Sequence, residues 1–292
     1  MNLHHLTLFD AVATEKHISK AAGKLRISQP AVSKQLQLLE RSLGTPLLDR
    51  TPKGVRLTAA GELLAGYARR ILALSDEAEH AVAQLRGLKR GRLTIGASTT
   101  LGAYFLPEIL AQYRTAHPDI DLDLQIANTE DIQRQLLEGK VEIAVTEGFI
   151  HHGGLSERKF MGDELVPVAK PGHPLLAKGG GVSLKAFCAE PMLVREQGSG
   201  TREVIEDALK KRGITVKPLM TLGSTEAIKH SVAAGVGVAF VSGLSVRQEL
   251  KDGRLAQVAI HGFKLERALH VVQAKDRVAS AAVGAFLGML GG

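Results

Sequence analysis

Four polar side chains recur at helical spacing in ISQPAVSKQLQLLERSLG, residues 27–44. They are Gln29, Ser33, Lys34 and Gln37, and they alternate with the apolar residues Val32, Leu36, Leu39 and Leu43. We expect this apolar set to anchor the helix on its domain. Amide, hydroxyl and ammonium groups on one helix face match the base edges and phosphates of a DNA groove. An ordinary amphipathic helix with a solvated polar face has the same pattern. The elements around this segment must therefore decide between the two interpretations.

The preceding residues predict two helices that would position this segment. Apolar residues at helical spacing predict a helix over residues 3–14, and HISKAAGKLR predicts a short second one over residues 17–26. Ser28 is a natural N-cap for the third helix, and Pro30 is tolerated in its first turn. Gly44 is expected to end that helix. Two helices joined by a tight turn, with polar side chains outward on the second, are typical of a helix-turn-helix.

The following segment, TPLLDRTPKGVRLT, predicts a hairpin, because two short apolar runs flank the turn sequence RTPKG. From Lys16 to Arg56 the chain holds nine basic and two acidic residues. A winged helix-turn-helix of this charge favours nucleic acid as the partner. The candidate DNA-binding residues are Ser28, Gln29, Pro30, Ser33, Lys34 and Gln37 on the helix, and Arg50, Lys53 and Arg56 on the wing.

The charge of the whole chain supports the same division. The net charge is +7, and residues 1–90 hold 14 Lys and Arg against 8 Asp and Glu, whereas the remaining residues are nearly balanced. The single cysteine excludes an intrachain disulfide and fits a reducing compartment. No apolar run approaches the length of a membrane span. We therefore expect a cytoplasmic protein with no membrane partner.

Two apolar seams with a seven-residue period follow the hairpin and predict a long helix that pairs with a partner. Gly61 and Gly66 weaken this helix. The alternative is a helix packed on its own domain. The seams are Leu57, Leu64, Ile71, Ala78 and Leu85, and, three residues later, Ala60, Tyr67, Leu74, Ala81 and Leu88.

From residue 91 onward, strands and helices alternate, which implies parallel sheets covered by helices on both faces. The expected strands are 92–97, 120–126, 141–146, 165–169, 191–194, 218–222, 236–241 and 268–273. The expected helices are 103–115, 129–138, 200–212, 225–234, 243–250 and 278–290. Two such units, divided near residue 162 and rejoined near residue 267, would leave a cleft between them.

Three loops in this region place Gly, Ser and Thr at helix starts, where backbone N–H groups and hydroxyls can bind a small anion. They are GASTTLGAYFLP, REQGSGTREV and LGSTEAIKH. Plain N-capping is the alternative for each loop, since helix starts commonly use Ser and Thr. The candidate effector-binding residues are Ser98, Thr99, Thr100, Thr146, Gln197, Ser199, Gly200, Thr201, Arg202 and Thr225.

No catalytic or metal-binding motif is present in the sequence. It has no phosphate-binding loop of the nucleotide-hydrolase type, no dinucleotide fingerprint and no G-x-S-x-G elbow. The pairs His4-His5 and His151-His152 lack metal-ligand spacing, and Cys188 has no second thiol. We expect no cofactor and no metal. A substrate-binding or enzymatic α/β module fused to a helix-turn-helix stays open as the alternative function.

The order of these parts resembles the LysR-type transcriptional regulators. HLTLFDAVA, ISKAAGKLRISQPAVSKQLQLLERSLGTPLLDR and VRLTAAGELL are very similar to that family's N-terminal signature. The resemblance implies a winged helix-turn-helix over residues 1–58, a linker and dimerisation helix over residues 59–90, and a periplasmic-binding-protein-like α/β effector domain over residues 91–292. It implies two subdomains in the last, residues 91–162 with 268–292 and residues 163–267.

The resemblance also implies partners. These are double-stranded DNA at a promoter dyad site, a small anionic metabolite, a second or further copies of the chain as a homodimer or homotetramer, and RNA polymerase as a further candidate. It implies effector contacts from Ser98, Thr100, Thr146, Ser199 and Thr201. QGSGTR, residues 197–202, resembles the family branch that senses reduced-sulfur, sulfate-like or Calvin-cycle metabolites.

Overall fold

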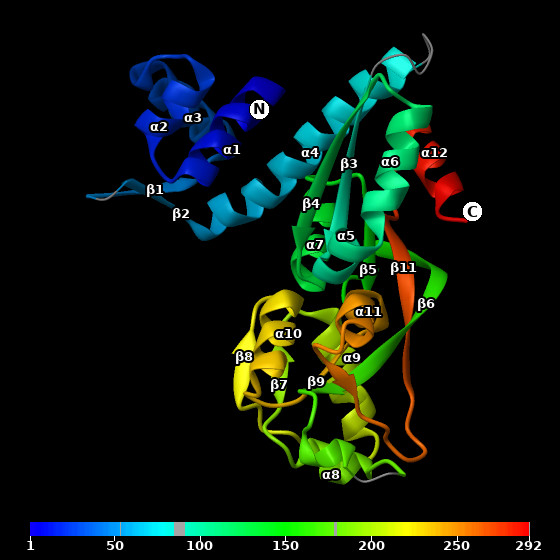
Figure 1. Cartoon of the computed structure of the whole chain (residues 1–292). Coiled ribbons are helices and arrows are strands. Elements are labelled where there is room, and N and C mark those ends of the chain that lie inside the picture. The colour runs from blue at the N-terminus through cyan, green and yellow to red at the C-terminus, as the bar shows by residue number, and fades with distance from the viewer. Residues whose placement is uncertain (53, 85–90, 178–179, 292) are drawn as a thin grey trace. The chain divides into compact units, whose positions relative to one another are not determined.

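The computed structural model of the chain describes residues 1–52, 54–84, 91–177 and 180–291. They form two compact units, an N-terminal one with the first four helices and a hairpin, and a C-terminal one with the remaining strands and helices (Figure 1). Lys53, Leu85 and Leu88 lie outside the described residues. Among the described residues, no helix is both long and apolar enough to cross a membrane.

The N-terminal unit confirms the predicted winged helix-turn-helix. Its elements are α1 (Leu3–Glu15), α2 (Ile18–Leu25), α3 (Gln29–Leu43), β1 (Leu48–Thr51), β2 (Gly54–Leu57) and α4 (Ala59–Gln84). The two strands pair antiparallel. Side chains from α1, α2, α3 and α4 share one apolar core centred on Phe9, Val12, Val32 and Leu39, all fully buried.

Helix α3 begins and ends where its cap residues predict. The Ser28 hydroxyl accepts a hydrogen bond from the Ala31 amide at 3.4 Å, and Gly44 takes the left-handed conformation, with φ of 70°, just after the last turn. Val32, Leu36 and Leu39 are buried as expected. The prediction for Leu43 was wrong, because this last residue before the turn is 40% exposed.

Helix α4 divides its apolar residues between two surroundings. The Thr58 hydroxyl accepts a hydrogen bond from the Gly61 amide at 3.0 Å and caps the helix. Leu57, Ala60, Leu64 and Ile71 pack against the core of their own unit, which is the alternative considered for the heptad seams. The exposed residues lie along another face, at positions four or seven apart. This stripe consists of Leu63, Tyr67, Leu74, Ala78 and Val82.

The C-terminal unit follows most of the predicted alternation. Its strands are β3 (Gly91–Ser98), β4 (Ile120–Ala127), β5 (Ile143–Glu147), β6 (Leu155–Ala169), β7 (Leu193–Arg195), β8 (Met220–Leu222), β9 (Ala239–Ser242), β10 (Ala256–Gln257) and β11 (Leu265–Ala274). Its α-helices are α5 (Thr99–Tyr104), α6 (Leu106–Ala116), α7 (Thr129–Leu137), α8 (Leu184–Cys188), α9 (Gly200–Lys210), α10 (Thr225–Ala234), α11 (Gly243–Lys251) and α12 (Ala281–Met289).

The main sheet is mixed, so the expectation of purely parallel sheets was wrong. Its strand order is β10-β6-β11-β5-β3-β4, with β9 also paired to β6. Strand β3 runs parallel to β4 and β5, whereas every pair that includes β6 or β11 is antiparallel. Strands β7 and β8 form a separate parallel pair.

Strand β6 is ten residues longer than the predicted strand 165–169. Its first ten residues, LSERKFMGDE, include five exposed and five charged ones, so they carry no strand pattern. The strand forms because it pairs with β11 from Leu155 to Leu165. Pairing partners distant in the chain, and not local propensity, stabilise this segment.

Two lobes with separate apolar cores make up the C-terminal unit. The first lobe packs β3, β4, β5, α5, α6, α7 and α12 around residues such as Ile95, Tyr113 and Phe286. The second packs β7 to β10 and α8 to α11 around Phe187, Phe240 and Val241. Strands β6 and β11 run through both lobes (Figure 1).

Candidate functional site

The predicted DNA-facing side chains of α3 lie on its solvent side. Gln29, Pro30, Lys34 and Gln37 are exposed, as is the cap residue Ser28. Ser33 is half-buried beside them. This polar face is opposite the buried apolar face that fixes the helix to its unit.

Glu40, on the inner side of α3, fixes the start of the hairpin relative to this helix. Its Oε1 accepts hydrogen bonds from the amides of Leu47 and Leu48, at 2.7 and 3.2 Å. Arg50 and Arg56 extend from the hairpin and are exposed. Helix and wing therefore present cations and amides from one rigid support, as groove and phosphate contacts require.

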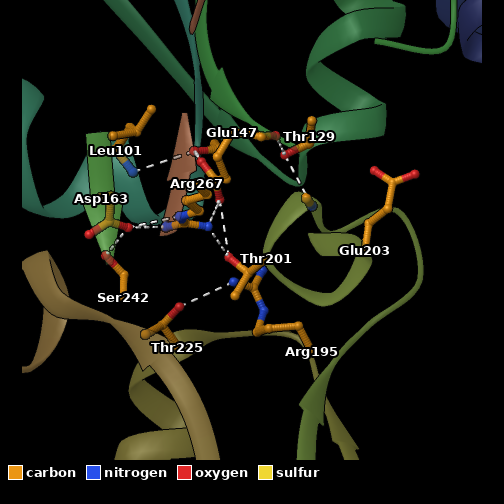
Figure 2. Close-up of polar contacts among 12 residues, drawn as sticks. Leu101, Thr129, Glu147, Asp163, Arg195, Thr201, Glu203, Thr225, Ser242 and Arg267 are labelled. Carbon is orange, nitrogen blue, oxygen red and sulfur yellow. Dashed lines mark hydrogen bonds and ion pairs between the residues drawn. The ribbon is translucent and has the colours of Figure 1, made fainter. Parts of the chain in front are cut away.

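In the C-terminal unit, the buried carboxylate of Glu147 lies between the two lobes, at the end of β5. Ser98 Oγ, at the start of α5, donates to Glu147 Oε2, and Thr201 Oγ1, in the first turn of α9, donates to Oε1 at 3.2 Å. Arg267 Nη1, on β11, lies 3.3 Å from the same Oε1. Three donors from both lobes thus converge on one carboxylate. Figure 2 shows two of them, Thr201 and Arg267, beside Glu147.

Arg267 connects Glu147 with a second buried carboxylate, Asp163. Its Nε and Nη2 each lie 2.8 Å from Asp163 Oδ2, and its Nη1 donates to Thr201 Oγ1 at 2.7 Å. Ser242 Oγ also donates to Asp163 Oδ2, at 2.8 Å. The guanidinium lies between the two acids (Figure 2). All three charged groups are at least nine-tenths buried, and two carboxylates share one cation.

The backbones of the two lobes also meet at Gly200, the first residue of α9. Its amide donates to Thr129 Oγ1 at 3.2 Å, and that hydroxyl donates to the Glu147 carbonyl at 3.1 Å. A Cβ on Gly200 would lie 2.2 Å from the Glu147 carbonyl oxygen. Only glycine permits this approach, so the start of α9 is held directly against the end of β5.

Two further buried cations are fully paired near this centre. Arg195 Nη1 donates to Thr225 Oγ1 at 3.1 Å, and its other nitrogens form a bidentate pair with Glu196. Lys229 Nζ lies 2.8 Å from Glu249 Oε1. It also lies 4.9 Å from the ring centre of Tyr104, so α10 of one lobe contacts α5 of the other.

A cavity of roughly 340 Å³ opens between the lobes, at the starts of α7 and α9. Arg202 and His151 are its basic side chains. Arg202 pairs with Glu206 at 2.6 Å, and His151 with Glu203 at 2.7 Å. The lining residues are Thr129, Glu130, His151, Gln197, Gly198, Ser199, Arg202, Glu203 and Glu206.

The structure separates the candidate effector residues into several groups. Ser98 and Thr201 contact Glu147, Gly200 contacts Thr129, and Thr225 contacts Arg195. The candidates in the cavity wall are Gln197, Ser199 and Arg202. Thr99 and Thr100 lie in the first turn of α5.

Thr146 is not brought to the Glu147 centre. Side chains alternate along a strand, so Thr146 lies on the opposite face of β5 from Glu147, across from His270 on β11. Its buried Oγ1 has no hydrogen-bond partner among the described residues.

Sequence reasoning missed the charged members of this centre, Glu147, Asp163 and Arg267, together with Thr129 and Ser242. A signal existed for Glu147 and Arg267, because each interrupts an apolar strand with a charge, in IAVTE and LERAL. A charge inside a strand that is buried on both faces needs a partner.

His4, His151 and His152 are exposed, whereas His5 and Cys188 are half-buried. His5 Nε2 is 2.9 Å from Gln35 Oε1, and His151 pairs with Glu203. Within the described part of the chain, no group of three His, Cys, Asp or Glu could hold a metal ion. Burial raises the pKa of the Cys188 thiol to about 11.

Comparison with known proteins decides the family. Residues 3–62 match the lysR family of bacterial regulatory helix-turn-helix proteins, and residues 86–292 match the LysR substrate binding domain. The chain belongs to the LysR family.

Among LysR-family relatives, the transcriptional regulator CysL of Bacillus subtilis is 34% identical over 91% of this chain and 89% of its own length. The transcriptional activator CmpR of Synechocystis is 32% identical over 99% of this chain and 94% of its own length. The regulatory domain of Synechocystis CcmR was solved in complex with 2-PG. Its alignment with this chain covers 69% of this chain and 96% of that domain, with 27% identity and a TM-score of 0.64. The relatives are regulators, so the chain is a transcriptional regulator and not an enzyme.

Proposed function

We propose that this LysR-family regulator binds a promoter dyad and that a small anionic metabolite, bound between the lobes of its C-terminal unit, controls it. One observation carries the effector part: Ser98, Thr201 and Arg267 converge on a carboxylate at a buried point between the lobes. An anion that accepts hydrogen bonds from donors on both lobes would hold the two lobes together. In this proposal, residues 1–58 bind DNA, residues 59–90 form the linker and dimerisation helix, and residues 91–292 bind the effector. The protein acts on DNA in the cytoplasm.

The DNA contacts in this proposal come from the exposed face of α3 and from the hairpin. Gln29, Ser33 and Lys34 would contact base edges, because the start of a recognition helix enters the major groove. The hairpin arginines Arg50 and Arg56, with Lys53, would contact phosphates. We expect the cations to set affinity and the polar face of α3 to set sequence preference.

Assembly in this proposal uses the exposed apolar stripe on α4. A stripe with helical spacing along a helix of 26 residues supports pairing with the same stripe on a second copy. A two-fold dimer matches a two-fold operator. We extend the same proposal to assembly into a homotetramer and to contact with RNA polymerase.

A sulfate-, phosphate- or carboxylate-bearing metabolite is the proposed effector class. The structural relative was solved with 2-PG, which supports an anion. Regulation requires that the effector bind one arrangement of the protein more tightly than another. An effector with equal affinity for both would not shift the equilibrium between them.

A gel shift on the DNA upstream of the chain's own gene tests the DNA-binding part. Lys34→Ala and Arg56→Ala should each weaken binding, and Lys34→Ala should also relax preference over unrelated DNA. The exposed C-terminal Arg254→Ala is the matched control and should bind as the wild type does. Equal binding of every DNA by all four proteins would contradict the proposal.

A further inference from the structure

We propose that Glu147 is an internal competitor for the effector, so that the effector's acidic group binds only by taking the donors that Glu147 now holds. This inference rests on the proposed function, because it concerns the same site. It assigns Glu147 the role of a residue that sets effector affinity and selects against weakly acidic ligands.

The donors that an anion would need are already engaged. Ser98 Oγ and Thr201 Oγ1 both donate to the Glu147 carboxylate, one to each of its oxygens. A hydroxyl has a single proton, so neither side chain can donate to Glu147 and to a ligand at the same time. A ligand that uses these hydroxyls as donors therefore displaces the Glu147 carboxylate from them.

The position of Glu147 is also where an anion is electrostatically favoured. Thr201 is the second residue of α9, an 11-residue helix whose dipole makes its start positive. The carboxylate lies at this end, held by a side chain of the first turn. The same field would attract the acidic group of a metabolite.

Charge balance favours exchange over simple addition. Glu147 and Asp163 share the single guanidinium of Arg267, whereas the nearby Arg195 and Lys229 have their own carboxylate partners. A third negative group added to this buried centre would have no further cation to pair with. If the Glu147 carboxylate moves away as the ligand enters, a singly charged ligand leaves the charge beside Arg267 unchanged, and a doubly charged one adds a single negative charge.

The ligand class follows from the donor set. Two hydroxyls and one guanidinium nitrogen match a group with at least two charged oxygens, such as a carboxylate, sulfate or phosphate. A group with three terminal oxygens offers one acceptor oxygen to each of the three donors, whereas a carboxylate has only two oxygens. Phosphate and sulfate esters are thus favoured over simple carboxylates.

Isothermal titration of the full chain with inorganic phosphate, sulfate and 2-phosphoglycolate tests this exchange. Glu147→Gln should bind the preferred anion about ten-fold more tightly or better, since removing one charge-assisted interaction changes an equilibrium by roughly this factor. Glu147→Asp, whose shorter side chain keeps the charge but reaches the hydroxyls less well, should give an intermediate gain. That second variant keeps the test usable if the first does not fold.

Asp163→Asn is the matched control, because it removes a buried carboxylate from the same guanidinium without freeing Ser98 or Thr201. A gain confined to the Glu147 variants supports the exchange. An equal gain in Asp163→Asn, or no gain in Glu147→Gln, overturns it. If the wild type binds and Ser98→Ala weakens binding, the proposed anion site stands whatever Glu147→Gln does. If no protein in the set binds any of the anions, the anion site itself fails, and the exchange with it.

Discussion

Arg267 illustrates how single residues set the properties of the cleft. Among the described residues it is the cation that pairs with both buried carboxylates, Glu147 and Asp163. The hydroxyls of Thr201 and Ser242 bond to Arg267 and to Asp163, respectively. Breaking a buried ion pair from one side leaves an unpaired charge, which costs more free energy than the pair contributes. Substitutions of Arg267, Glu147 and Asp163 should therefore lower the free energy of unfolding by different amounts.

We predict that Arg267→Met lowers the free energy of unfolding by about 3–5 kcal/mol, because both carboxylates lose their partner. Glu147→Gln should change it far less, since Arg267 and Asp163 then balance one to one. Urea unfolding followed by circular dichroism measures both. Arg254→Met, at an exposed position, should stay within about 0.5 kcal/mol of the wild type. Equal losses in the Arg267 and Glu147 variants would refute this charge balance.

Cys188 gives a second prediction at this scale. Its pKa is raised from 9.0 to about 11 because burial disfavours the thiolate. At pH 7 the thiolate fraction should be about a hundred-fold below that of an unperturbed thiol, since each pKa unit is a factor of ten. Iodoacetamide should therefore react about a hundred-fold more slowly with the folded chain than with the urea-unfolded chain. A rate equal in both states would contradict the shifted pKa.

Among the secondary-structure elements, helices α4 and α9 allow the clearest predictions. Helix α4 packs one face on its own unit and leaves an apolar stripe exposed, so it both completes a core and offers an assembly surface. Helix α9 begins at Gly200, where the backbones of the two lobes lie too close for any side chain. Each arrangement can therefore be tested by a substitution at one position.

Leu74→Glu, at a stripe position that is 57% exposed, should dissociate the dimer without unfolding the monomer, because a charge would be buried in the paired helices. Sedimentation velocity should show the mass of one chain at concentrations where the wild type shows two or more. Glu79→Gln, also exposed on α4, should leave the mass unchanged. Retention of the wild-type mass by the Leu74 variant would place the interface elsewhere.

Gly200→Ala should destabilise the C-terminal unit by roughly 1–3 kcal/mol, because its Cβ would overlap the Glu147 carbonyl oxygen. Gly284→Ala is the control. Gly284 lies inside α12, where an added Cβ meets nothing within 4 Å, so alanine should raise stability by up to ~1 kcal/mol. Thermal unfolding of the two variants should move in opposite directions. A shift in the same direction would exclude the backbone contact as the cause.

The sequence was most informative where local signals decide structure. Cap residues such as Ser28 and Gly44 marked the ends of α3, and the turn RTPKG marked the hairpin. The first half of β6 was missed because its exposed, charged residues are held by pairing with β11, more than a hundred positions later. The charged members of the Glu147 centre were missed for the same reason, since Glu147, Asp163 and Arg267 come from three different strands.

At the scale of the whole molecule, the uneven distribution of charge matters most. Nearly all of the +7 net charge lies in the first 90 residues. Binding of DNA by such a surface releases counterions and weakens steeply as salt rises. The C-terminal unit, being nearly neutral, should add little to this dependence.

Arg56→Ala should therefore reduce the slope of log K against log salt by about one per bound chain, because one phosphate contact is lost. Fluorescence anisotropy with a labelled operator, over a series of salt concentrations, measures the slope. Arg254→Ala removes the same charge from the C-terminal unit and should leave it unchanged. An equal decrease in both variants would show that only overall charge matters.

The continuity of β6 and β11 through both lobes limits how the lobes can move. A slip of one residue between these strands would turn every side chain of the moving strand to the other face, which would take Arg267 out of its centre. Translation along the ribbon is therefore blocked, and rotation remains. The bulge between Leu269 and His270 locally disrupts the pairing and increases twist. We expect the ribbon to act as a torsional hinge: an effector that draws the lobes together would turn one about the other, with the register of the ten β11 residues preserved.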